Sequence, residues 1–134
     1  MTVEGTILVT VDSLRADALS GPGAADRAPV LSELAADAVV FENAFAHGNW
    51  TPFSFPSIMA SKPVFTADDG IGVRDATTLA TALARDGVES AGFNAANGFL
   101  TSPWGYDEGF DRFESFVEAD SGPIRRFLTA HPTV

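Results

Sequence analysis

The chain has 134 residues, which is enough for one domain with a single hydrophobic core. Acidic residues outnumber basic residues by 18 to 8, and the formal net charge of −10 makes nucleic acids and anionic membranes poor partners. The absence of cysteine excludes disulfide scaffolds, zinc fingers, iron–sulfur centres and thiol catalysis. With 46% hydrophobic residues, the chain is too apolar to be a disordered acidic tail.

The composition also predicts where the protein resides. No apolar run approaches the roughly 18 to 20 residues of a membrane span, and the first residues lack the pattern of a signal peptide. We therefore expect a cytoplasmic protein. The excess of acidic residues over basic ones, with Lys62 as the single lysine, fits a halophilic protein that stays soluble at high intracellular salt.

The first half of the chain contains three patterned segments. Residues 6–11 form an apolar, β-branched run that predicts a buried strand of a parallel sheet, and this run ends at Asp12. Residues 29–36 begin with proline and carry apolar side chains at helical spacing, which predicts a helix. Residues 39–46 are rich in strand formers and predict a second strand or an extended segment.

A helix start is predicted at Thr51 and Pro52, with the threonine as N-cap and the proline as first helical residue. Because proline breaks helices, Pro56 predicts that this helix is short or begins again just before it. Ile58 and Met59 are expected on its buried side.

The second half continues the alternation of helix and strand. Residues 77–85 predict an amphipathic helix closed by Asp86 and Gly87, and residues 88–94 predict a strand. Phenylalanines over 110–117 indicate an aromatic-anchored segment, and a last short helix is expected near 124–129. This order predicts an α/β sandwich with a mainly parallel sheet.

Two side chains are candidates for chemistry. Asp12 directly follows the first predicted strand, where its carboxylate suits a hard divalent cation or, alternatively, caps the turn that follows. Thr51 lies at a predicted helix N-terminus, where backbone N–H groups can orient an anionic ester, although a threonine here can also be only a cap. If both bind one metal ion, Asp12 is its ligand and Thr51 the activated nucleophile of a phosphoryl or sulfuryl transfer site.

Structural roles suit the other polar and aromatic candidates better. Isolated histidines are more often structural than catalytic, large aromatics beside Pro and Gly pack loops, and neighbouring acids without calcium-loop spacing form a solvated surface. These residues are His47, His131, Trp50, Trp104 and the acidic pair Asp68 and Asp69. Arg15 is expected to pair with Asp17 or another acid.

Ordered blocks of sequence resemble the sulfatase family of the alkaline phosphatase superfamily. Residues 7–17 resemble its opening strand and metal-ligand turn, and residues 50–61 fall where the family has its nucleophile and the helix behind it. Its first helix, the extended segment after it and a later loop are matched by 28–35, 40–46, 97–100 and 105–111. The resemblance extends over roughly residues 5–118.

The resemblance implies an alkaline-phosphatase-like fold, Asp12 as a metal ligand, and Thr51 as nucleophile and second ligand of a divalent ion such as Ca²⁺, Mg²⁺ or Mn²⁺. Family sulfatases convert a Cys or Ser at the nucleophile position to formylglycine, which a threonine cannot become. The family's arginine four residues later is replaced here by Phe55. Threonine is the nucleophile of related phosphodiesterases and phosphotransferases, so a phosphate ester is an alternative to a sulfate ester.

In the family, the remaining metal ligands and the substrate-binding lysine and histidine come from a downstream half. We therefore expect residues 1–134 to be the N-terminal part of a sulfatase-like hydrolase with an incomplete ligand set, which a second chain would complete. The alternative is a non-catalytic α/β module that pairs with another chain. A nucleotide-binding domain fits less well, because no glycine-rich loop follows the first predicted strand.

Overall fold

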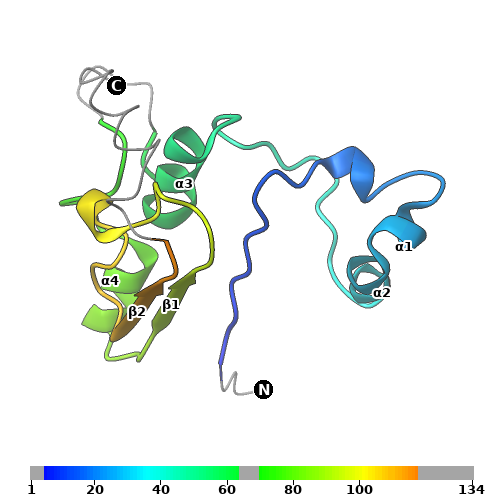
Figure 1. Cartoon of the computed structure of the whole chain (residues 1–134). Coiled ribbons are helices and arrows are strands. Elements are labelled where there is room, and N and C mark those ends of the chain that lie inside the picture. The colour runs from blue at the N-terminus through cyan, green and yellow to red at the C-terminus, as the bar shows by residue number, and fades with distance from the viewer. Residues whose placement is uncertain (1–4, 64–69, 118–134) are drawn as a thin grey trace. The chain divides into compact units, whose positions relative to one another are not determined.

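The computed structural model describes residues 5–63 and 70–117. The chain divides into an N-terminal unit, Met1–Phe45, and a C-terminal unit, Ala46–Val134, and each is described by itself (Figure 1). The helix expected near 124–129 lies outside the described residues. Within the described part, no helix has both the length and the apolar character needed to cross a membrane.

Short helices make up the regular structure of the N-terminal unit. They are η1 (Ala16–Ala18), α1 (Ala24–Arg27) and α2 (Pro29–Ala36). The bounds of α2 confirm the predicted helix, because proline's fixed φ suits the first helical position, where its missing N–H is not needed. The Arg27 guanidinium closes the preceding loop by donating to carbonyl oxygens of Asp17, Ala18, Ser20 and Pro22 at 3.2 to 3.4 Å.

The strand predicted over residues 6–11 is wrong, since this segment pairs with no strand in the part of the chain that the structure describes and its side chains are exposed. Ile7 is 88% exposed and Val9 is 74% exposed. Residues 39–46 also form no strand and contain a turn, with Phe41 80% exposed. The physical reason is that an apolar run becomes a buried strand only where other strands pair with it and helices pack on it, and no residue of α1 or α2 is buried in such a contact.

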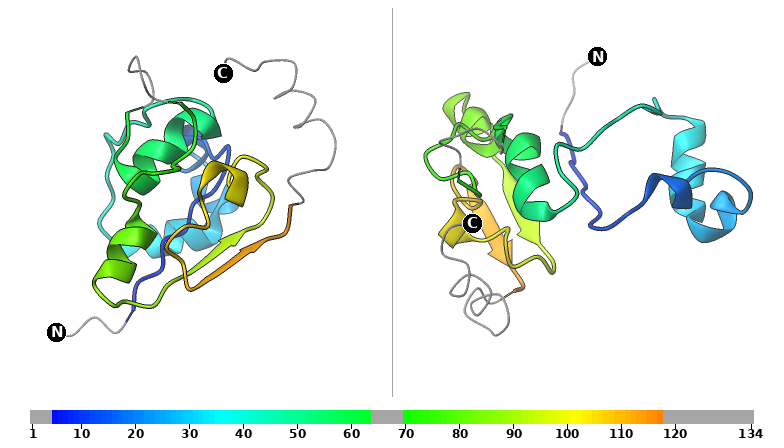
Figure 2. Two further views of the ribbon diagram at one scale, coloured as in Figure 1. Left: turned by 90° about the vertical axis from the view of Figure 1, so that its left-hand side faces the viewer. Right: turned by 90° about the horizontal axis from the view of Figure 1, so that it is seen from above.

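The C-terminal unit contains a parallel pair of strands, β1 (Ala91–Asn94) and β2 (Arg112–Ser115). They run side by side in one direction (Figure 2), with Ala91 opposite Arg112 and Asn94 opposite Ser115. The strand predicted over residues 88–94 ends at the same residue as β1 but begins three residues before it. Strand β2 was not predicted, because its residues were expected only in an aromatic-anchored segment. The unit is therefore of mixed α/β character with a small parallel sheet.

Helix α3 (Thr51–Ala60) continues through the proline that was expected to interrupt it. Pro56 lies inside the helix and is fully buried, and burial of its ring acts against the roughly 3 kcal/mol that an interior proline costs. The helix begins one residue earlier than predicted, with Trp50 as N-cap and Thr51 as first helical residue. Ile58 is 48% exposed, so its predicted burial is wrong, and Met59 is half-buried.

Helix α4 (Leu79–Arg85) confirms most of the helix predicted over 77–85. It begins two residues later because Thr78 is its N-cap: the Thr78 hydroxyl accepts from the Thr81 N–H at 3.1 Å, and the Thr81 hydroxyl accepts from the Thr78 N–H at 2.7 Å. This reciprocal capping box satisfies N–H groups that a helix start leaves without intrahelical partners. Helices α3 and α4 contact one another.

A small core is built from the loop between α3 and α4, from α4 itself and from the loop between β1 and β2. Val73, Ala80 and Tyr106 are its buried hydrophobic residues among those described. Gly109 packs against the start of α4 with φ +90°, and a Cβ there would fall 2.6 Å from the Thr81 Cα and closer still to its nitrogen. Only glycine fits both this conformation and this approach.

Candidate functional site

The candidate nucleophile Thr51 lies at the start of α3 with 9% of its surface exposed. The N-cap position belongs to Trp50, whose side chain makes no capping hydrogen bond. The alternative interpretation of Thr51 as the N-cap is therefore wrong. Its hydroxyl is instead part of a contact with a distant loop.

That contact is a hydrogen bond from the Asn97 side chain, whose Nδ2 donates to the Thr51 Oγ1 at 3.0 Å. The Asn97 amide is oriented by its other end, because Oδ1 accepts from the Phe99 N–H at 3.0 Å. Since Oδ1 is used in this way, the donor end of the amide faces Thr51. The threonine oxygen thus receives an N–H donor from a side chain of fixed orientation.

The loop that carries Asn97 is anchored to the end of β1 by Asn94, which is 7% exposed. The Asn94 Nδ2 donates to the Asn97 and Leu100 carbonyl oxygens at 2.7 and 2.8 Å and to the Ser115 Oγ at 3.1 Å. Its Oδ1 accepts from the Asn97 N–H at 3.0 Å. This arrangement places the loop at the carboxyl end of a parallel strand, where α/β sheets hold ligands.

Aromatic rings join the same two segments. Trp50 makes edge-to-face contacts with Phe53 and with Phe99, each at 5.2 Å between ring centroids, and Phe99 lies 6.3 Å from Trp104. These contacts agree with the prediction that the tryptophans pack loops. Because Trp50 precedes Thr51 and Phe99 follows Asn97 by two residues, the Trp50–Phe99 contact supports the hydrogen bond between Asn97 and Thr51.

Neither Asn94 nor Asn97 was predicted to have a functional role. Residues 97–100 entered the sequence analysis only through their resemblance to a loop of the sulfatase family. The available signal was their position. Both come at or directly after the predicted end of a parallel strand, which is where polar side chains converge in this class of sheet.

The candidate metal ligand Asp12 is exposed and lies in a turn with Ser13, whose φ is +57°. It belongs to the N-terminal unit and Thr51 to the C-terminal unit, so their sharing of an ion remains a prediction. The expected pairing of Arg15 with Asp17 is confirmed, with Nε 2.9 Å from the Asp17 Oδ1. This guanidinium lowers the pKa of the Asp17 carboxyl below its usual value.

Among residues 5–63 and 70–117, no three histidine, aspartate or glutamate side chains gather closely enough to hold a metal ion. The carboxylate of Asp12 and the hydroxyl of Thr51 would supply two of the roughly six ligands of a divalent ion. These residues alone do not make a metal centre. His47 is exposed, whereas His131, Asp68 and Asp69 lie outside the described residues.

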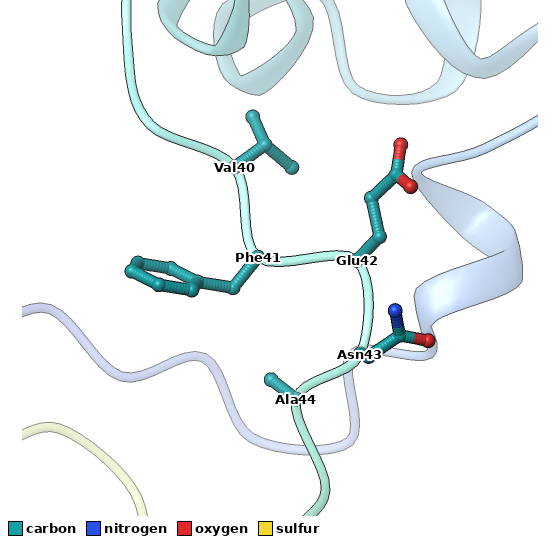
Figure 3. Close-up of a pocket in the computed structure, with 5 residues that line it drawn as sticks. All are labelled: Val40, Phe41, Glu42, Asn43 and Ala44. Carbon is teal, nitrogen blue, oxygen red and sulfur yellow. The ribbon is translucent and has the colours of Figure 1, made fainter.

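A surface hollow in the N-terminal unit is lined by the consecutive residues Val40, Phe41, Glu42, Asn43 and Ala44 (Figure 3). In this view the Phe41 ring points away from the polar ends of Glu42 and Asn43. A binding site needs polar groups that converge from several elements, and this lining supplies them from a single segment. The hollow therefore provides no candidate site.

Tyr106 is a buried titratable residue near α3. Its ring meets the Phe55 ring edge-on at 5.9 Å between centroids, and its Oη has no hydrogen-bond partner within the described part of the chain. Burial raises the pKa of the Tyr106 phenol well above its ordinary value. Because the folded state disfavours the phenolate, the folded protein loses stability as the pH rises above about 10, where the unfolded chain ionises.

We expect Tyr106→Phe to leave stability at pH 7 unchanged or raise it by about 1 kcal/mol, because it removes an unpartnered buried hydroxyl. At pH 11 the variant should gain further over the wild type, since it has no phenol to ionise on unfolding. Urea unfolding at both pH values measures this difference. Tyr106 is the single tyrosine, so phenolate absorbance follows its titration directly. A titration midpoint near 10 in the folded protein would contradict the argument.

Comparison of the chain with protein-family models, with curated proteins and with solved structures gives no match. The sulfatase resemblance of the sequence therefore remains a prediction. The features that bear on function are the residues around Thr51 and the mixed α/β character of the C-terminal unit.

Proposed function

We propose that this chain carries the nucleophile-bearing part of a sulfatase-like hydrolase of sulfate or phosphate esters, with Thr51 as the nucleophile. The observation that supports it best is the hydrogen bond from the Asn97 Nδ2 to the Thr51 Oγ1 at the start of α3. When a hydroxyl oxygen accepts a hydrogen bond from an N–H of fixed orientation, this bond stabilises the anionic form of the oxygen. Its place at a helix N-terminus also favours an anionic substrate.

The proposed reaction transfers a phosphoryl or sulfuryl group to Thr51. The Oγ1 attacks phosphorus or sulfur, a new Oγ1–P or Oγ1–S bond forms, and the bond to the ester oxygen breaks. The hydroxyl proton goes to solvent, and the ester oxygen leaves as the alcohol after taking up a proton. Water then attacks the phosphorus or sulfur of the covalent intermediate, the bond to Oγ1 breaks, and phosphate or sulfate leaves (a phosphate monoester where the substrate was a diester) as Thr51 regains its hydroxyl.

Asp12 remains the proposed protein carboxylate for a divalent ion, with Thr51 as its other ligand. Such an ion supplies Lewis-acid stabilisation of the attacking oxygen when it is bound. Asp12 and Thr51 account for two of the roughly six ligands of a divalent ion, so the proposal takes the remaining ligands from elsewhere, such as a second chain. Activity of the chain alone is therefore expected to be weak and dependent on added Mn²⁺, Mg²⁺ or Ca²⁺.

The test is an assay of the purified chain with aryl sulfate, phosphate monoester and phosphodiester substrates, with each ion in turn. We expect turnover of at least one ester class and a fall of about 10³-fold or more in Thr51→Ala, which removes the attacking oxygen. Thr51→Ser retains a hydroxyl and should keep measurable turnover.

Ser57→Ala is the matched control, because it removes another α3 hydroxyl, one that donates to the Ser54 carbonyl oxygen at 2.7 Å. It should leave turnover unchanged. If Thr51→Ala retains the wild-type rate, or if no ester reacts with any ion, the catalytic proposal is wrong for this chain.

A second candidate function is a non-catalytic module that pairs with another chain. It is favoured by the N-terminal unit, where apolar side chains remain open to solvent: Phe45 is 90% and Val39 is 80% exposed. Contiguous exposed apolar surface marks sites of protein association. Absence of turnover, together with formation of a stable complex with a second chain, would favour this function over the first.

A further inference from the structure

The side chain of Asn94 holds both backbone polar groups of Asn97. Its Oδ1 accepts from the Asn97 N–H at 3.0 Å, and its Nδ2 donates to the Asn97 carbonyl oxygen at 2.7 Å. The same Nδ2 reaches Leu100 and Ser115 at 2.8 and 3.1 Å, so it ties the loop after β1 to its own end and to β2. A buried amide with these partners has one favourable orientation.

The geometry continues from Asn97 to Thr51. The backbone N–H and carbonyl of Asn97 are both hydrogen-bonded to Asn94. In the Asn97 side chain, Oδ1 accepts from the Phe99 N–H, and Nδ2 donates to the Thr51 Oγ1 at 3.0 Å. The end of β1 is thereby connected to the start of α3 through one asparagine. Movement of the loop would remove the N–H donor from the threonine oxygen.

We propose that Asn94 is a positioning residue for Thr51, which acts through Asn97 to keep an N–H donor on the attacking oxygen. The inference rests on the proposed function, in which Thr51 is the nucleophile. A donor on this oxygen stabilises its anionic form relative to the hydroxyl. Asn94 thus contributes to reactivity by fixing the backbone that carries the donor.

The chain contains no cysteine, so Thr51→Cys introduces a single thiol at the reactive position. The full-length variant is alkylated with iodoacetamide over a range of pH. The thiolate sulfur forms a bond to the reagent's carbon, iodide leaves, and the thiol proton goes to solvent. Because only the thiolate reacts, the midpoint of the rate against pH gives the thiol pKa.

With Asn97 donating to the sulfur, we expect this midpoint to lie below that of variants in which the donor is removed. Adding Asn97→Ala should raise it by about one unit, the size of one net hydrogen bond. Adding Asn94→Ala should raise it by a similar amount. The triple variant with both alanines should show no further rise, because Asn94 acts through Asn97.

Thr101→Val is the control for loosening of the same loop, since the Thr101 hydroxyl donates to the Gly98 carbonyl oxygen at 3.2 Å. It should leave the midpoint unchanged. Tryptophan fluorescence verifies that each variant is folded. Where Asn94→Ala does not fold, Asn94→Ser takes its place, because its hydroxyl oxygen can still accept from the Asn97 N–H, and an intermediate midpoint is expected.

The inference is overturned if Asn94→Ala or its substitute leaves the midpoint at the Thr51→Cys value, or if Thr101→Val raises it equally. The titration needs neither ester nor metal ion, so its outcome is separate from the turnover assay. Turnover without the thiol shift would overturn the role of Asn94 and retain the proposed function. The thiol shift without turnover would retain the positioning geometry and overturn the proposed function.

Discussion

Gly109→Ala should destabilise the C-terminal unit by about 2 to 6 kcal/mol, the sum of backbone strain and overpacking. The substitution forces an L side chain into φ +90° and directs its Cβ against the Thr81 backbone at the start of α4. Backbone cannot yield as a flexible side chain can, so the loop or the helix must shift. Urea unfolding followed by the fluorescence of Trp50 and Trp104, the two tryptophans of the chain, measures the loss.

Gly87→Ala is the control for strain without collision. Gly87 also has a positive φ, +72°, but no atom lies within 4 Å of the Cβ that would be added. We expect it to cost only about 1 to 2 kcal/mol. If the two variants unfold at the same urea concentration, close packing of Gly109 on α4 is not the reason for the glycine.

Thr78→Val should lower the free energy of unfolding by about 1 to 2 kcal/mol. The substitution preserves shape and β-branching but removes the hydroxyl oxygen that accepts from the Thr81 N–H. Thr78 is 3% exposed, so water does not readily replace this acceptor. Urea or thermal unfolding measures the change, and loss of α4 should also lower the helical circular dichroism.

The neighbouring Thr77→Val is the matched control. Thr77 is exposed, and its hydroxyl accepts from the Arg85 Nη1 at 3.4 Å, a surface contact of little energetic weight. Its substitution should change stability by less than about 0.5 kcal/mol. Equal losses in the two variants would mean that the capping box does not stabilise α4.

Local signals in the sequence were sufficient for α2 and α4. Proline at a first helical position and apolar spacing defined α2, and the pattern of 77–85 with its closing Gly87 located α4 within two residues. These features act within a few residues of one another. Pro56 shows their limit, because the burial that allows it inside α3 depends on packing from elsewhere in the chain.

The strands depended on distant partners and were harder to predict. The run over 6–11 has strong strand character yet pairs with no strand among the described residues. Arg112–Ser115 was predicted only as part of an aromatic-anchored segment and becomes β2 through its register with β1. A strand is defined by hydrogen bonds to another segment, which the local pattern does not contain.

The candidate site was predicted in part. Position relative to expected elements led to Thr51, and the structure supplies the asparagine that contacts it. The two residues are separated by 46 positions, and the contact exists because the loop after β1 is fixed by Asn94. No periodicity or spacing in the sequence records such a pairing.

The small size of the parallel sheet has a consequence for assembly. Within the described residues, β1 pairs only with β2, so one edge of β1 presents backbone groups that could accept another strand. A segment that joins this edge in parallel would bring its own carboxyl end beside Asn94, and so toward the loop that reaches Thr51. The same segment would then both extend the sheet and bring additional reactive groups to the site around Thr51.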